Sequence, residues 1–121
     1  MRNDWLFVAA LNGFIAVAAG AFAAHGLQGR LDTHALGIFE TGARYQMYHA
    51  LAISLASLAY RTAATTLACS LFLVGIILFS GSLYLLALTD MRAFAFITPI
   101  GGLAFLAGWA ALAWSAVRTG P

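Results

Sequence analysis

The chain has 121 residues, of which 63% are hydrophobic and only 8% are charged. Soluble domains carry about 25% charged residues, so a chain this apolar cannot cover its surface with polar groups and is expected to lie in lipid. This excludes a free cytosolic enzyme and a disordered tail. The net charge of +2 comes from scattered arginines, which do not form the basic patch that nucleic-acid binding needs. They are Arg2, Arg30, Arg44, Arg61, Arg92 and Arg118.

Residue types that carry chemistry are few. The single cysteine, Cys69, lies in an apolar run and has no partner for an intrachain disulfide. No Ser-His-Asp set, phosphate-binding loop or pair of catalytic carboxylates is visible. We therefore predict that the protein is not an enzyme and has no catalytic residue, no bound metal and no cofactor.

Four apolar segments are predicted to be helices, at about residues 5–24, 36–60, 66–88 and 98–117. A helix needs about 20 residues to cross roughly 30 Å of hydrocarbon. Helices are the open-chain structures that satisfy every backbone amide within lipid. The sequence thus predicts four transmembrane helices.

The second apolar run, from about Tyr45 to Tyr60, is too short to cross the membrane unless the helix begins earlier. A start near Leu36 brings Glu40 and Arg44 into the helix, four residues apart and on one face. At this spacing the two side chains can neutralise each other. That pairing makes a long second helix tolerable in a membrane.

The connection between the first two helices is the only sizeable polar one. Asp32 is suited to cap a helix, and apolar residues recur at helical spacing around it. We predict a short interfacial amphipathic helix that lies on the membrane and turns into the second helix. An ordinary ordered loop is the alternative.

The remaining connections are short, which makes neighbouring helices antiparallel. The predicted fold is all-α: a four-helix transmembrane bundle, up-down-up-down, forming a single integral membrane domain over residues 1–121. Both termini then lie on one side. The distribution of arginines favours the cytoplasm for that side.

Small residues recur at four-residue steps on two helices. The first helix carries Ala9, Gly13, Ala16, Gly20 and Ala24, and the last carries Gly101, Gly102, Ala104 and Gly108. In lipid, helices are held together by close packing through such residues. The stripes are predicted to pack the bundle, with a homo-oligomer or partner interface as the alternative.

The predicted topology places most polar side chains on the side away from the termini. This far-side polar cluster comprises His25, Glu40, Arg44, Tyr45, Gln46, Tyr48, His49, Ser80, Ser82, Tyr84 and Thr98. Charge inside a membrane is costly and indicates function by default, which favours a headgroup, quinone or anion site at Arg44. The structural alternative is a salt bridge to Glu40 with aromatic anchors at the headgroup level.

Two further polar features need an interpretation. His25 and His49 lie on adjacent helices, as the two axial ligands of a haem would, but no carboxylate has ligand spacing, so haem and metal are disfavoured. Asn12 is the one strongly polar residue inside the first helix. It is predicted to make a hydrogen bond to another helix, worth about 1 kcal/mol.

Four motifs resemble those of a known family. They are the runs 20–27 (GAFAAHGL), 39–51 (FETGARYQMYHAL), 79–84 (FSGSLY) and 98–102 (TPIGG). They resemble the small membrane proteins grouped as domain of unknown function 423, whose eukaryotic relatives are called the transmembrane protein 256 family. The resemblance covers essentially the whole chain. It implies four helices and, for bacterial members, the inner membrane, but no catalytic residues, because the family has no established activity.

Three functional hypotheses follow. The first is a non-enzymatic accessory, assembly or stabilising subunit, with the lipid bilayer and a larger membrane complex or a homo-oligomer as partners. The second is a lipid- or quinone-binding protein that uses Arg44, Tyr45, Tyr48 and His49. The third is an oligomeric transporter or channel. The expected location is the bacterial inner membrane.

Overall fold

The computed structural model describes residues 2–118, which form helices apart from their connections. The ends of the predicted domain, residue 1 and residues 119–121, lie outside this range. The elements are α1 (Asp4–His25), α2 (Thr33–Leu58), α3 (Ala63–Gly75), the π-helix η1 (Ile76–Ser80), α4 (Gly81–Thr89), the 3-10 helix η2 (Arg92–Phe96) and α5 (Thr98–Arg118). Since α3, η1 and α4 are continuous, and η2 leads directly into α5, the described chain forms four rods. The prediction of an all-α fold with four helices is confirmed.

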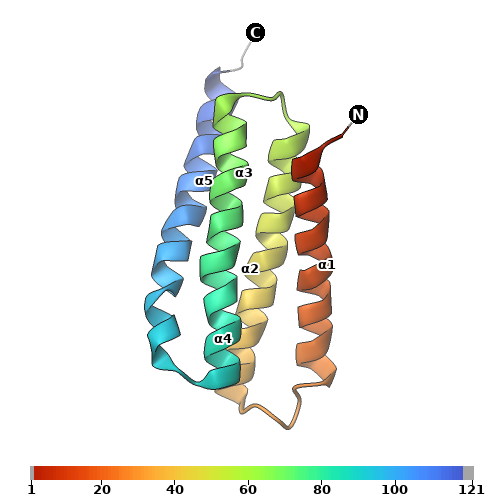
Figure 1. Cartoon of the computed structure of the whole chain (residues 1–121), viewed down its shortest axis with the longest axis vertical. Helices are drawn as coiled ribbons and strands as arrows, with labels where there is room; N and C mark the ends of the chain where they lie inside the picture. Colours follow the sequence, from red (N-terminus) through yellow and green to blue (C-terminus); the bar gives the residue numbers. More distant parts are fainter. Residues whose placement is uncertain (1, 119–121) are drawn as a thin grey trace.

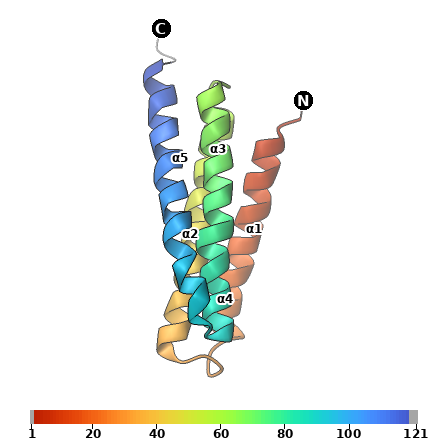
Figure 2. The same cartoon turned by 60° about the vertical axis from the view of Figure 1, so that its left-hand side comes forward.

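The rods lie side by side, and their connections alternate between the two ends of the bundle (Figure 1). The N- and C-termini are at the same end, which we call the terminal end. The opposite end, called the far end, holds the connection from α1 to α2 and the connection from α4 to α5 (Figures 1 and 2).

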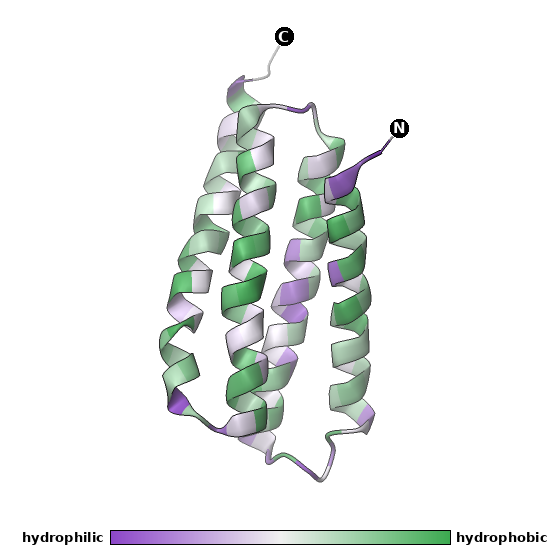
Figure 3. Ribbon diagram, in the orientation of Figure 1, coloured by the Kyte–Doolittle hydropathy of each residue, from purple (hydrophilic) through white to green (hydrophobic). Residues whose placement is uncertain are grey.

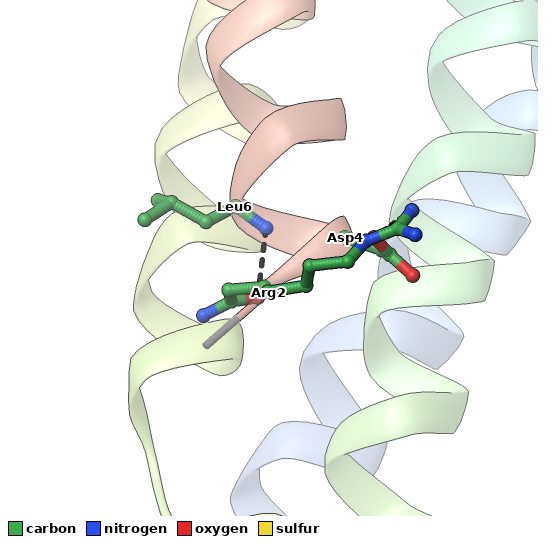
Figure 4. Close-up of polar contacts among 4 residues, drawn as sticks. Arg2, Asp4 and Leu6 are labelled. Carbon is green, nitrogen blue, oxygen red and sulfur yellow. Dashed lines mark hydrogen bonds and ion pairs between the residues drawn. The ribbon is translucent and has the colours of Figure 1, made fainter.

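Side-chain caps fix where three of the helices begin. At the start of α1 the Asn3 side chain accepts a hydrogen bond from the Leu6 amide at 3.0 Å, beside an exposed ion pair between Arg2 and Asp4 (Figure 4). Thr62 and Thr65 form a reciprocal capping box at the start of α3. Such caps satisfy amides that have no partner within the helix.

The first turns of α2 differ from the prediction. Asp32 caps α2 itself, because its carboxylate accepts a hydrogen bond from the Ala35 amide at 2.7 Å. From Thr33 the helix runs without interruption to Leu58. No separate helix lies between α1 and α2 in the range 2–118, so the predicted interfacial helix is wrong. The physical reason is that the buried face at Phe39 and Ala43 continues in register along α2, so one helix buries the whole face.

The rods pack in sequence order. α1 packs against α2, α2 against α3, η1 and α4, and α5 against α3 and η1. The main core lies where α2, α3 and α5 meet, around Ile53, Phe72 and Phe105, which are almost completely buried. A smaller core around Leu27, Phe39 and Ala87 closes the far end.

Close approach through glycine is concentrated between α5 and the rod of α3 and η1. A Cβ at Gly101 would come within 2.4 Å of the Phe79 backbone nitrogen, so the two backbones touch there. Phe105 lies over Gly75, and Phe72 lies over Gly108. Gly101 and Gly108 of the predicted stripe on the last helix thus pack the bundle.

The predicted stripe on the first helix is only partly used. Ala9 and Ala16 are buried against the rest of the chain. Gly13 and Gly20 have no atom within 4 Å of the place where a side chain would begin, and Ala24 is exposed. The face of α1 that packs against the rest of the chain therefore does not include Gly13 and Gly20.

Three rods are long and apolar enough to cross a membrane: Asp4–His25, Ala63–Thr89 and Arg92–Arg118. α2 is not among them, although its 26 residues are sufficient in length. Figure 3 shows hydrophilic residues at the middle of α2, while the other rods are mainly hydrophobic. The least apolar helix, α2, is therefore an interior rod, with α1 on one side and α3 and α4 on the other.

Candidate functional site

A chain of hydrogen bonds crosses the middle of the bundle. The Gln46 amide nitrogen donates to the Asn12 side-chain oxygen at 3.0 Å, and the Tyr84 hydroxyl donates to the Gln46 side-chain oxygen at 2.7 Å. The Asn12 amide also donates to the Val8 carbonyl at 2.9 Å. We call Asn12, Gln46 and Tyr84 the inner polar chain. It links α1, α2 and α4, so the interhelical hydrogen bond predicted for Asn12 is present.

A glycine on α2 makes room for this chain. A Cβ at Gly42 would lie only 3.0 Å from the Tyr84 ring, so the ring lies directly against the helix. The Phe39 ring flanks Tyr84, with a centroid distance of 4.8 Å. Gly42 and Phe39 thus hold the phenol in position to reach Gln46.

His49 is held by two hydrogen bonds of opposite direction. Its Nδ1 lies 2.8 Å from the Tyr45 carbonyl, which can only accept, so Nδ1 carries the proton. Trp109 donates its indole N–H to Nε2 at 3.2 Å. The ring also stacks on Phe105 with a centroid distance of 3.5 Å. These partners define a neutral imidazole with the proton on Nδ1, buried between α2 and α5.

A second group of hydroxyls lies at the end of the π-helix and in the neighbouring turns of α4 and α5. The Ser82 hydroxyl lies 2.6 Å from the Thr98 hydroxyl, and this contact joins α4 to the start of α5. Ser82 also donates to the Phe79 carbonyl. The Ser80 hydroxyl is fully buried and has no hydrogen-bond partner among the described residues. π-helical turns are common near functional sites, but they also occur where helices pack closely, as η1 does against Gly101.

Arg44 does not pair with Glu40. Its guanidinium donates to the Thr41 hydroxyl at 3.1 Å, and within residues 2–118 the one ion pair is Arg2 with Asp4. The predicted neutralisation is therefore wrong. Helical side chains lean toward the N-terminus of their helix, and an exposed arginine in lipid extends its charge toward the nearest polar surface. For Arg44 both effects direct the charge toward the far end.

The side chains of the predicted far-side polar cluster are divided between buried and exposed positions. Gln46 and Tyr84 meet in the inner polar chain, Ser82 meets Thr98, and His49 is buried with the aromatic rings around it. His25, Arg44 and Tyr48 are exposed, and Tyr45 is partly exposed with its ring against Phe79 and Phe105. The cluster is therefore not one continuous site.

Trp109 was not among the predicted residues. In the sequence it is one tryptophan of an apolar helix, and only its partner His49 distinguishes it. The signal that could have identified Trp109 is His49 itself. A buried imidazole needs a partner at each ring nitrogen, and a neighbouring helix can supply one.

The described residues show no metal centre, since no three His, Cys, Asp or Glu side chains gather closely enough to hold an ion. The larger surface hollow at the far end is a cleft of about 660 Å³ between the start of α2, the end of α4 and η2. Arg30, His34 and Arg92 are among its lining residues. This cleft brings together cations that are far apart in the sequence.

Comparison with known proteins gives the family. Residues 19–102 match the model of the family described as "Protein of unknown function (DUF423)". The chain belongs to this family. The resemblance predicted from the four motifs is thus confirmed.

The relatives of this DUF423 protein are bacterial membrane proteins. A "UPF0382 membrane protein" of Haemophilus influenzae is 47% identical over 122 residues, which cover 98% of each chain. The Escherichia coli "UPF0382 inner membrane protein YgdD" is 47% identical over 93% of this chain and 88% of its own. The Bacillus subtilis "UPF0382 membrane protein YwdK" is 40% identical over 94% of this chain and 96% of its own. No solved structure matches the chain.

These relatives and the three apolar rods place the protein in the bacterial inner membrane, as predicted. The names of these three relatives state no activity. The function must therefore be inferred from the arrangement of the helices and their polar groups.

Proposed function

We propose that this protein is a non-enzymatic accessory subunit that docks against a larger membrane complex and stabilises it. The support comes from the order in which the rods pack. α1 and α5 each pack on one side of the bundle, and only 22% and 17% of their most apolar windows are buried, against 33% for the rod between them. Both outer helices thus offer long faces to the membrane.

The observation that carries the proposal is the open space at two glycines of α1. Gly13 and Gly20 are spaced seven residues apart and have no neighbour within 4 Å. In lipid a stripe of this kind lets the backbone of another helix approach closely. Glycine at these positions lowers helix propensity without serving the packing of this chain, which supports contact with a helix of a partner.

The proposal is tested by purification in mild detergent at native expression, with the Gly13→Leu and Gly20→Leu double variant beside the natural chain. A stoichiometric partner is expected with the natural chain and is lost with the double variant. Ala18→Leu, at an exposed position on a different face of the same helix, is the matched control and should keep the partner. A chain that always migrates alone would contradict the proposal.

The proposed arrangement in the membrane is four crossings, up-down-up-down, in a single domain with both termini in the cytoplasm. Arg2, Arg61 and Arg118 belong to the terminal end, and Arg30 and Arg92 to the connections at the far end. Arg44 lies inside α2 and is counted with the crossing helix rather than with a connection. An excess of arginine favours the cytoplasmic side. α2 crosses as the least apolar helix, because its polar groups bond to its neighbours.

A lipid-binding role is the second candidate, favoured by Arg44, whose exposed guanidinium has only the neutral Thr41 hydroxyl as a partner. Of the other residues proposed for that role, Tyr48 is exposed beside it, whereas His49 is occupied by Tyr45 and Trp109. A transport role has less support, because the inner polar chain satisfies its own groups across the bundle rather than lining a path along it.

A further inference from the structure

The far-end cleft brings basic side chains from three separate segments together. Arg30 comes from the connection after α1, His34 from the first turn of α2, and Arg92 from the start of η2. The two arginines are 62 positions apart in sequence, and the fold places both on one cleft of about 660 Å³. Its walls are mainly apolar, with Leu86 and Phe96 among them.

A shallow groove extends this cleft along the bundle. The groove has a volume of about 440 Å³ and is lined by Arg44, Thr41 and Leu83. It shares His34 and Ile38 with the cleft, so the two hollows adjoin. Together they form a charged rim at the far end that continues into the shallow groove between α2 and α4.

The charges around these hollows leave an excess of positive charge. Arg30, Arg44 and Arg92 face two acids that also line the cleft, Asp32 and Asp90. The Asp32 carboxylate is engaged by the Ala35 amide as the cap of α2. No ion pair joins these arginines to these acids in the described part of the chain. The guanidinium groups therefore keep their capacity to bind an anion.

We propose that the cleft and groove bind one anionic phospholipid of the surrounding membrane. Its phosphate would lie between Arg30 and Arg92, because guanidinium groups form paired hydrogen bonds with phosphate oxygens. One acyl chain would lie in the groove along Ile38 and Leu83, below the Arg44 guanidinium. A lipid with a net negative headgroup is favoured over a zwitterionic one, whose ammonium would face the same arginines. This site is independent of the helix-docking face of α1.

The test is lipid retention by the full-length protein, measured by native mass spectrometry after transfer from detergent. Phosphatidylglycerol and phosphatidylcholine with identical acyl chains are offered separately, and inorganic phosphate alone is a third probe. One phosphatidylglycerol is expected to be retained at least several-fold more strongly than phosphatidylcholine. Arg30→Gln and Arg92→Gln should each weaken retention about fivefold, the usual contribution of one cation near an anionic lipid surface.

Matched variants make the result specific. Arg61→Gln and Arg118→Gln remove the same charge at the terminal end and should leave retention unchanged. Arg92→Lys keeps the charge but loses the paired hydrogen bonds, so it should weaken retention less than Arg92→Gln does. Equal retention of the two lipids, or equal losses in both pairs of variants, would overturn the proposal. Binding of inorganic phosphate as tight as that of the lipid would show a free anion site and would also overturn it. Neither outcome bears on the partner experiment with Gly13 and Gly20, so the two proposals fail separately.

Discussion

Gln46, on α2, is hydrogen-bonded to two neighbouring helices, α1 and α4. Its amide nitrogen is bound to Asn12 on α1 and its oxygen to Tyr84 on α4, so both ends of the amide have partners. In a membrane such bonds contribute about 0.6 kcal/mol on average and up to about 1.7 kcal/mol, because an unfolded chain also finds partners. The contribution is modest, but the bonds require a single register of three helices.

The first prediction concerns this junction. Asn12→Ala and Gln46→Ala should show a coupling free energy of about 0.5–1.5 kcal/mol in a double-mutant cycle, because each removes the partner of the other. The free energy of unfolding is measured by denaturant titration in detergent. Asn12→Ala with Ser70→Ala, whose hydroxyl bonds within its own helix, should be additive. Additive losses in the Asn12 and Gln46 cycle would show that the bond is not formed.

The second prediction concerns His49. Trp109→Phe removes the donor that His49 Nε2 has among residues 2–118 and should cost about 1–3 kcal/mol of stability, because a buried acceptor is left without that partner. Nitrogen NMR of the natural protein should show the proton of His49 on Nδ1. The control is Trp114→Phe, at an exposed position of the same helix. A proton on Nε2 would contradict the bond from Trp109.

At the scale of the elements, α5 and the π-helix are matched to each other. The Gly101 backbone touches the Phe79 backbone inside η1, and Phe105 and Phe72 lie over glycines of the opposite rod. A π-turn shifts the direction of the side chains that follow it. The irregular turn and the absent side chain at Gly101 therefore occur at one contact.

The third prediction compares two glycines. Gly101→Ala should destabilise the protein by about 1–3 kcal/mol, because the new methyl group meets backbone atoms that cannot rotate away. Gly20→Ala should be neutral or stabilising by up to about 1 kcal/mol, since its surroundings are open and alanine favours helix. Thermal unfolding in detergent measures both. A larger loss for Gly20→Ala would contradict the contact between α5 and η1.

The elements could be predicted better than the site. Hydropathy located the apolar rods, and Asp32 was expected to cap a helix, which it does for α2. The continuity of α2 could not be predicted, because its first turns are amphipathic and fit an interfacial helix equally well. The pairing of Glu40 with Arg44 failed because sequence spacing does not fix the direction of long side chains. Contacts such as those of Gln46 with Asn12 and Tyr84 depend on helix rotation, which composition does not encode.

At the scale of the whole molecule, the rods form an open series rather than a closed ring. α2 has neighbours on both sides, while α1 and α5 end the series. The terminal end carries both chain ends, and the far end carries the cleft lined by Arg30 and Arg92. The two ends of the bundle thus differ in chemistry, as expected of a protein with a fixed orientation.

The fourth prediction concerns that orientation. A reporter that fluoresces only in the cytoplasm should be active when fused to either terminus. A cysteine introduced at Gln28 or Asp90, in the two far-end connections, should react with a membrane-impermeant thiol reagent added from outside the cell. The same reagent should not label a cysteine at Arg61. Opposite behaviour of the two termini would contradict an even number of crossings.

The modest hydropathy of α2 has a consequence for biogenesis. A segment that partitions poorly on its own is not expected to leave the translocon alone, so we expect α2 to enter the bilayer as a hairpin with α1. The bond between Asn12 and Gln46 can form within that hairpin and would shield both amides from the acyl chains during insertion. Gln46 would then be accommodated by the order of synthesis, since it meets its first partner, Asn12, in the helix made just before it.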